Sequence, residues 1–347
     1  MPRCVPEMST VALAAPLVRR LARCGSVLFA LIFFNAIVRA QSAGEPPPSP
    51  GNAPGASTPS PAIENGPLPQ KLKPGTILFL SQSQSYESAG YSWDGKDNHD
   101  LQTVFQVARP ISDLALTKNS DTYYFVEGNN IMAAQPAQPE RTLFSIRDQL
   151  PGHNVRYLQV DDVGNVYFGL FGGDQHKMAE VGIYRISPPS GNDPAHAVLF
   201  CPISSSDLQN ADQVAQASAL AEGGTHRTQP YWAGAFCFGK TAKNTLDLDT
   251  IYLIAWGGPS SAIYRIKRQD GKWGDAEQLF EFEQIMVDLW VAGPSKAYFL
   301  SLDSASMRPA DLLNATPILY RLSDWSEADK IFTVPQQGYM FGFSVVP

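Results

Sequence analysis

The sequence lacks the short motifs that mark several common enzyme classes. It contains no G-x-S-x-G segment, no H-E-x-x-H segment and no C-x-x-C pair. The nucleophile turn of α/β-hydrolases and the standard zinc sites are therefore unsupported. The chain also has no long run of lysine and arginine, and its formal net charge is −7, so we do not expect a nucleic-acid partner.

Cysteine is scarce. The chain encodes four cysteines, and Cys4 and Cys24 lie in a segment that we expect to be removed. The other two, Cys201 and Cys237, lie in apolar runs typical of strands. Two buried free thiols are the favoured interpretation. A Cys201–Cys237 disulfide stays open as the alternative, because an exported chain permits one.

Residues 1–40 have the pattern of a secretory signal peptide. Four arginines precede a short apolar run, SVLFALIFFNAIV, and the small-residue pattern VRA before QSA follows it. The run is shorter than the about 20 residues that span a membrane. We predict a cleaved signal and no membrane span afterwards, with a retained anchor as the alternative. Residues 1–40 hold five arginines and one glutamate, so the rest of the chain carries a formal net charge of −11.

Residues 41–72 are dominated by proline, serine, glycine and alanine. Such a composition offers nothing to fill a core, and it is typical of a semi-extended, disordered linker. The folded domain is therefore expected over residues 73–347.

A unit of about 45 residues repeats along this domain. Each unit has an aromatic or apolar strand, as in TYYFVEG and NVYFGLF, and the centres of these strands are separated by 46, 43, 85 and 46 residues. An alternating strand precedes each centre, and two further strands follow it, as in GIYRIS and AVLFCP. Four short strands per unit, joined by turns such as DDVGN, predict the blade of an all-β propeller.

The first unit has only three strands. The last predicted strand, GYMFGFSVV, is not followed by the three strands that would complete a blade. We expect this last strand to become the innermost strand of the first blade, which closes the ring and removes an exposed edge. Five blades are favoured. Six remain possible, because the 85-residue interval is close to two periods. Residues 203–230 have no strand alternation and predict an insertion with a short helix.

The pattern DDVGNVYFG followed by GIYRIS resembles the repeats of NHL-type and gluconolactonase-like β-propellers, over about residues 75–347. The resemblance is structural, because enzymes and binding scaffolds share these repeats. Its gluconolactonase-like side implies a metal in the central channel, held by glutamate, asparagine and aspartate. The nearest residues by position are Glu127, Asn154 and Asp303, but none lies in a matching local motif.

Two sets of loops share one face of a propeller: those that precede the innermost strands and those that follow the second strands. Ligands bind at such loops. We call this face the mouth. The residues expected there are acidic, basic, amide and aromatic: Glu127, Asn129, His153, Asn154, His226, Arg227, Trp256, Asp303 and Tyr339.

Two functions are consistent with this sequence. The favoured one is an exported, non-catalytic binding module of the cell envelope, secreted or periplasmic, that recognises a protein or glycan partner and needs no cofactor. The alternative is a metal-dependent lactonase or related ester hydrolase that uses Ca²⁺ or another divalent cation. The recurring Tyr-Arg pairs on the third strands predict packing between blades and surface ion pairs.

Overall fold

A computed structural model gives the fold of the repeat region. The residues it describes are 72–83, 87–95, 101–117, 121–128, 130–135, 138–146, 153–173, 182–187, 195–203, 232–241, 245–257, 260–303, 315–335 and 339–346. The expected signal peptide, the linker up to residue 71 and nearly all of the insertion lie outside these residues. Within them, no helix is long and apolar enough to cross a membrane.

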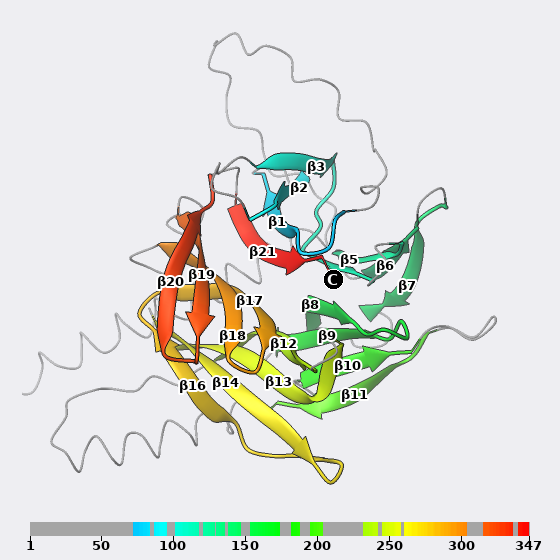
Figure 1. The fold of residues 1–347 in the computed structure, drawn as a ribbon. Helices are drawn as coiled ribbons and strands as arrows, with labels where there is room; N and C mark the ends of the chain where they lie inside the picture. The colour runs from blue at the N-terminus through cyan, green and yellow to red at the C-terminus, as the bar shows by residue number, and fades with distance from the viewer. Residues whose placement is uncertain are drawn as a thin grey trace, which may run out of the picture.

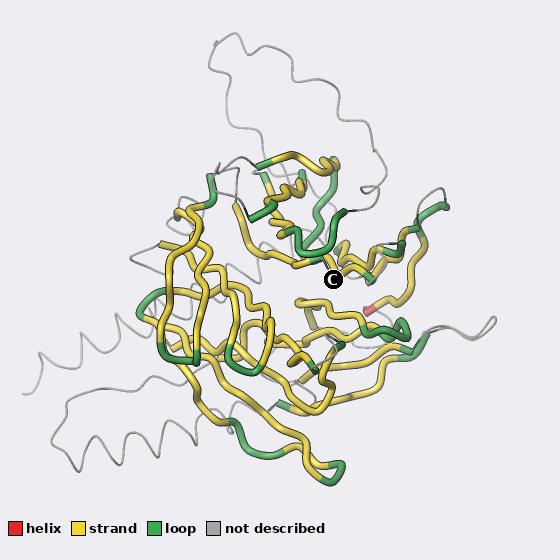
Figure 2. Tube along the Cα trace, viewed as in Figure 1, coloured by secondary structure: helices red, strands yellow, loops and turns green. Residues whose placement is uncertain are grey.

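The described chain forms five antiparallel sheets arranged around a common axis (Figure 1). Almost all of its regular structure is strand (Figure 2). Blade 1 consists of β21 (Tyr339–Val345), β1 (Ile77–Gln82), β2 (Ser88–Trp93) and β3 (Gln102–Val107), in that order from the axis outward. Blade 2 consists of β4 (Asp113–Leu116), β5 (Tyr123–Glu127), β6 (Asn130–Ala134) and β7 (Arg141–Ser145).

The other three blades repeat this order. Blade 3 consists of β8 (His153–Val160), β9 (Val166–Gly173), β10 (Gly182–Ile186) and β11 (Ala197–Pro202). Blade 4 consists of β12 (Trp232–Lys240), β13 (Leu246–Gly257), β14 (Ser260–Gln269) and β16 (Glu277–Phe282), with the short β15 (Lys272–Trp273) also beside β14. Blade 5 consists of β17 (Ile285–Gly293), β18 (Lys296–Asp303), β19 (Thr316–Ser323) and β20 (Glu327–Thr333).

This topology confirms the predicted five-bladed propeller and the role of the last strand. β21 pairs antiparallel with β1, with Phe343 opposite Phe79 and Val345 opposite Ile77. The innermost strands β21, β4, β8, β12 and β17 each contact the next one around the axis, and β17 contacts β21. The ring is therefore closed.

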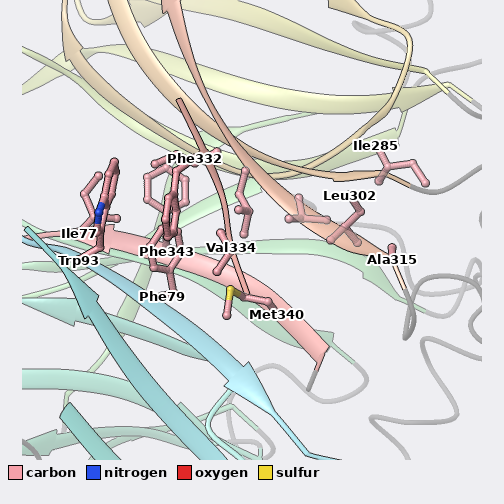
Figure 3. Close-up of a cluster of buried hydrophobic side chains, with 13 residues drawn as sticks. Ile77, Phe79, Trp93, Ile285, Leu302, Ala315, Phe332, Val334, Met340 and Phe343 are labelled. Atoms are coloured by element: carbon pink, nitrogen blue, oxygen red, sulfur yellow. The ribbon is translucent and has the colours of Figure 1, made fainter. Parts of the chain in front are cut away.

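Each sheet packs face to face against the sheets of the two neighbouring blades. The apolar core therefore lies between blades. The cluster between blades 5 and 1 shows this packing (Figure 3). The Trp93 and Phe332 rings stack with centroids 4.4 Å apart, and the Phe79 ring lies 6.0 Å from that of Phe332 and 6.4 Å from that of Phe343. Strands from both ends of the described chain therefore share one core.

The DDVGN segment forms the predicted hairpin turn between β8 and β9. Gly164 has a φ of 86°, a left-handed conformation that favours glycine. The Asp161 carboxylate accepts hydrogen bonds from the backbone N–H groups of Val163 and Asn165 and from the hydroxyl of Tyr167. The turn residues therefore serve the hairpin.

The two described cysteines are free thiols, as favoured above, and both are buried. Cys201 lies in β11 and Cys237 in β12. The Cys237 thiol donates to the carbonyl of Phe238 at 3.3 Å, and its sulfur accepts the Val291 N–H at 3.4 Å. Burial raises the pKa of this thiol to about 11, which disfavours the reactive thiolate.

Candidate functional site

Six of the nine predicted mouth residues lie at the expected ends of the described strands. Glu127 and Asp303 are the last residues of β5 and β18, and Trp256 is close to the end of β13. His153 and Asn154 begin β8, and Tyr339 begins β21. Asn129, His226 and Arg227 lie outside the described residues. Side-chain contacts are described for Glu127 and Asp303 alone among the nine, so the remaining residues stay predictions.

Glu127 takes part in an ion-pair group that involves Arg109, from the connection between blades 1 and 2. The Arg109 guanidinium lies 3.3 Å from the Glu127 carboxylate and 2.5 Å from that of Glu140. It also lies over the Phe125 ring, 5.2 Å from its centroid. The hydrogen bond to Glu140, together with the charges of both carboxylates, raises the pKa of Arg109 against the lowering effect of burial. All three charged groups are partly exposed, so the group orients Glu127 more than it stabilises the fold.

Asp303 is exposed at the end of β18, opposite Thr316 of β19. Its charge adds to burial in raising the pKa of Tyr320. Within the described part of the chain, no group of three or more His, Cys, Asp or Glu side chains is placed to hold a metal ion. The proposed set of Glu127, Asn154 and Asp303 stays a prediction, because the Asn154 side chain is outside what is described.

Two carboxylates that the sequence reasoning missed lie on the innermost strands. Asp288, in β17, is buried with 7% exposure. One of its oxygens accepts the N–H of Leu289 and the other accepts the N–H of Phe343 in blade 1, both at 2.8 Å. Asp113, in β4, accepts the N–H of Leu114 at 2.7 Å and also that of Leu158 in blade 3.

Each of these carboxylates therefore joins its own blade to the next one. Asp288 joins blade 5 to blade 1, and Asp113 joins blade 2 to blade 3. A sequence signal for them exists, because ISDLAL and MVDLWV place Asp-Leu at the same position of two innermost strands.

Burial raises the pKa of Asp288 well above its usual range, and the nearby Asp113 charge adds to this effect. The two backbone N–H donors oppose the shift, because they favour the ionised form. A carboxyl group with a raised pKa is one feature of a general acid. Here both oxygens accept backbone hydrogen bonds, and the arrangement is that of a structural connection between blades.

Tyr157 is the third residue near the axis that the sequence did not indicate. It has a φ of 61°, which is uncommon for a residue other than glycine. Its hydroxyl donates to the Val287 carbonyl of β17 at 3.3 Å. β8 and β17 belong to blades 3 and 5, which are not neighbours. The Tyr157 side chain therefore reaches past blade 4 and occupies space near the axis.

The segment GAFCFGKT, residues 234–241, has the spacing of a phosphate-binding loop. Such a loop needs a turn that opens a helix. The structure instead places residues 234–240 in β12, with Phe236, Cys237 and Phe238 buried. The Lys240 ammonium lies over the Trp290 ring, 5.8 Å from its centroid. The segment therefore matches the spacing of a phosphate-binding loop but forms a strand, not a phosphate site.

The third-strand Tyr-Arg pairs behave as predicted in two blades. Arg265 pairs with Glu277 at 2.6 Å and Arg321 pairs with Asp329 at 2.7 Å. For Arg185 in blade 3 no ion pair with a described carboxylate is present, and Val198 stands opposite it, where the other two blades have an acidic residue. The expected ion pair stays a prediction for this blade, because residues 174–181 and 188–194 beside it in the sequence lie outside the described part of the chain.

No protein-family model matches this chain, and no curated protein matches it. Solved structures with similar folds include a gluconolactonase from Xanthomonas campestris, with 9% identity and a TM-score of 0.43, over 78% of this chain and 79% of that one. TolB from Acinetobacter baumannii has 12% identity and a TM-score of 0.40, over 75% of this chain and 53% of that one. The propeller domain of Cps50 from Myceliophteria thermophila has 10% identity and a TM-score of 0.32, over 79% and 74%.

These neighbours include a gluconolactonase and other propellers, as the repeat resemblance predicts. Their identities and TM-scores are too low to carry an argument about activity. The assignment of the fold rests on the strand order and register of the chain itself: it is a closed, five-bladed β-propeller.

Proposed function

We propose that this chain is an exported, non-catalytic binding module of the cell envelope, which recognises a protein or glycan partner through its mouth. The supporting observation is how the described carboxylates around the axis are used. Asp113 and Asp288 accept backbone N–H groups of neighbouring blades, and Glu127 pairs with Arg109. These groups make a rigid support for loops, which is what a binding surface requires.

The export part of the proposal rests on the signal-peptide pattern of residues 1–40. A secreted or periplasmic location follows from that pattern, and residues 41–72 would then separate the propeller from its point of attachment. No cofactor is part of the proposal.

The test uses the purified full chain on a glycan array and in cross-linking with envelope protein extracts. A specific glycan or cross-linked protein is expected, with binding weakened by Asp303→Asn at the mouth. Asp249→Asn is the matched control, because Asp249 is an exposed carboxylate near the opposite end of a second strand. The control should bind like the wild type.

The opposite outcome is equally clear. Elemental analysis and assays of glucono-lactone hydrolysis on the same preparation test the metal-dependent alternative. A bound divalent cation, with hydrolysis that is lost on chelation and restored by the cation, would replace binding with catalysis as the function.

A further inference from the structure

A row of side chains crosses blades 4 and 5 at the same level. In each blade a tyrosine of the second strand stands opposite an arginine of the third strand, which stands opposite an acidic residue of the fourth. The residues are Tyr252, Arg265 and Glu277 in blade 4, and Tyr298, Arg321 and Asp329 in blade 5. Both arginines form ion pairs with the acidic residue. The fourth strand therefore supplies the negative charge that the arginine requires.

Blade 3 has the same row without the acidic residue. Tyr167 of β9 stands opposite Arg185 of β10, and Arg185 stands opposite Val198 of β11. Arg185 acts on the Tyr167 hydroxyl, whose pKa it lowers against the stronger raising effects of burial and Asp161. No described carboxylate forms an ion pair with Arg185. Among the described residues, the fourth strand of blade 3 therefore supplies no carboxylate opposite Arg185.

The exposed apolar side chains are gathered on the same blade. Three large hydrophobic residues are exposed in the described part of the chain: Val163 at 74%, Val198 at 51% and Leu199 at 42%. Val163 lies in the turn before β9, whereas Val198 and Leu199 are consecutive residues of β11. β11 is the outermost strand of its sheet and lies at the outside of the ring (Figure 1).

An edge strand offers backbone N–H and C=O groups to another strand, and proteins usually protect such an edge with charges or a cover. The fourth strands β16 and β20 carry exposed charged residues, Glu277 and Glu281 in β16 and Glu327 and Lys330 in β20. β11, with the sequence AVLFCP, has no charged residue. Its far end is covered, because the Trp273 indole N–H donates to the Phe200 carbonyl at 2.8 Å. The part with exposed apolar side chains is Ala197–Leu199, which we call the blade 3 edge.

We propose that the blade 3 edge docks an extended peptide segment of a protein partner, which adds as a strand beside β11 and places a glutamate or aspartate next to Val198, toward Arg185. Strand addition takes its affinity from main-chain hydrogen bonds and its specificity from alternate side chains. The acidic residue of the partner supplies the charge that Glu277 and Asp329 supply in the other blades. Apolar residues flanking it cover Val198 and Leu199. The edge lies toward the end of the blade opposite the mouth, because Ala197 and Val198 stand level with the start of β9, so the proposal does not depend on a ligand at the mouth.

The test selects a library of random phage-displayed dodecapeptides on the purified full chain. Enriched peptides are expected to alternate β-branched or aromatic residues around one acidic residue. Binding of a fluorescently labelled enriched peptide is then measured by anisotropy. Replacing its acidic residue with the amide should weaken binding to the wild type by roughly two- to fivefold, as for an exposed ion pair. The same replacement should have no effect on binding to Arg185→Gln.

Val198→Glu is the decisive variant, because it gives blade 3 the same row as blades 4 and 5. It should fold and melt at or above the wild-type temperature, since it adds a carboxylate beside Arg185. It should also weaken peptide binding by roughly tenfold, because the added charge both occupies Arg185 and repels the acidic residue of the peptide. Val163→Glu is the matched control, an exposed valine of the same blade outside the edge strand, and it should bind like the wild type.

Several results would overturn the proposal. One is selection of the same peptides by Val198→Glu; another is an enriched set without acidic residues. If the wild type is dimeric in light scattering and Val198→Glu is monomeric, the blade 3 edge binds a second copy of this chain and not a partner peptide. If the peptide binds only after deletion of residues 41–71, the blade 3 edge is occupied by that segment of the same chain. Loss of binding in Asp303→Asn, with Val198→Glu unaffected, would place the peptide at the mouth and support the proposed function alone.

Discussion

Replacing Phe343 with alanine tests whether the last strand closes the ring. Phe343 is 6% exposed in β21, and its ring lies 6.4 Å from that of Phe79, its partner across the β1–β21 pair. Truncating a buried phenylalanine to alanine costs about 3–5 kcal/mol. In a domain of this size each kcal/mol shifts Tm by about 2–4 °C. We therefore expect Phe343→Ala to lower Tm by roughly 6–20 °C in calorimetry of the full chain.

The control is Ser344→Ala, a partly exposed position on the same strand, which should change stability by no more than about 0.5 kcal/mol. Deleting residues 339–347 removes Met340, Phe343 and Val346 together, all buried, and should abolish cooperative unfolding. If Phe343→Ala melts within about 2 °C of the wild type, or if the deletion leaves the transition intact, β21 does not close the ring and the reasoning is refuted.

Three further predictions follow from buried groups. Because burial and Asp113 raise the pKa of Asp288, its contribution to stability is complete below about pH 3.9 and is lost as pH rises through the raised value. The Tm difference between the wild type and Asp288→Asn, followed by fluorimetry from about pH 4 to 8, should move in favour of the variant, and a difference independent of pH contradicts this. Gly90→Ala should destabilise by about 1–3 kcal/mol or more in urea unfolding, because its Cβ would lie 2.2 Å from the Phe105 ring. Gly293→Ala, with open space around it, should be nearly neutral, and equal effects would argue against the packing. The buried thiols of β11 and β12 should react with Ellman's reagent in denaturant and not in the native protein; rapid native reaction would contradict their burial.

The fold was largely predictable because the same order of four strands recurs along the sequence at a regular period. Strand types, the hairpin at Asp161–Asn165 and the pairing of β21 with β1 all follow from local patterns plus the need to protect an edge. The choice between five and six blades required the structure, in which the described strands between Tyr167 and Tyr252 belong to blades 3 and 4 alone.

The residues near the axis were harder to predict, because their roles depend on contacts between blades. The Asp-Leu pairs are visible in the sequence, yet the N–H groups that Asp113 and Asp288 accept belong to strands 45 and 55 residues away. Tyr157 reaches Val287 across 130 residues. The sequence does allow one difference between blades to be predicted. Aligning the three Tyr-Arg strands with the fourth strands that follow them puts Val198 at the position that Glu277 and Asp329 have in the other two blades.

The pairing of β1 with β21 has a consequence for biosynthesis. β1 is the first and β21 the last of the described strands, so blade 1 cannot be completed until the other four blades have been translated. Until then β1 has an open side and the core shared by blades 5 and 1 is exposed. Forming such a distant pair late in folding is slow. For the exported chain proposed above, this delay would keep the polypeptide unfolded for longer than a domain that folds on the ribosome. An unfolded chain can pass through a translocation pore.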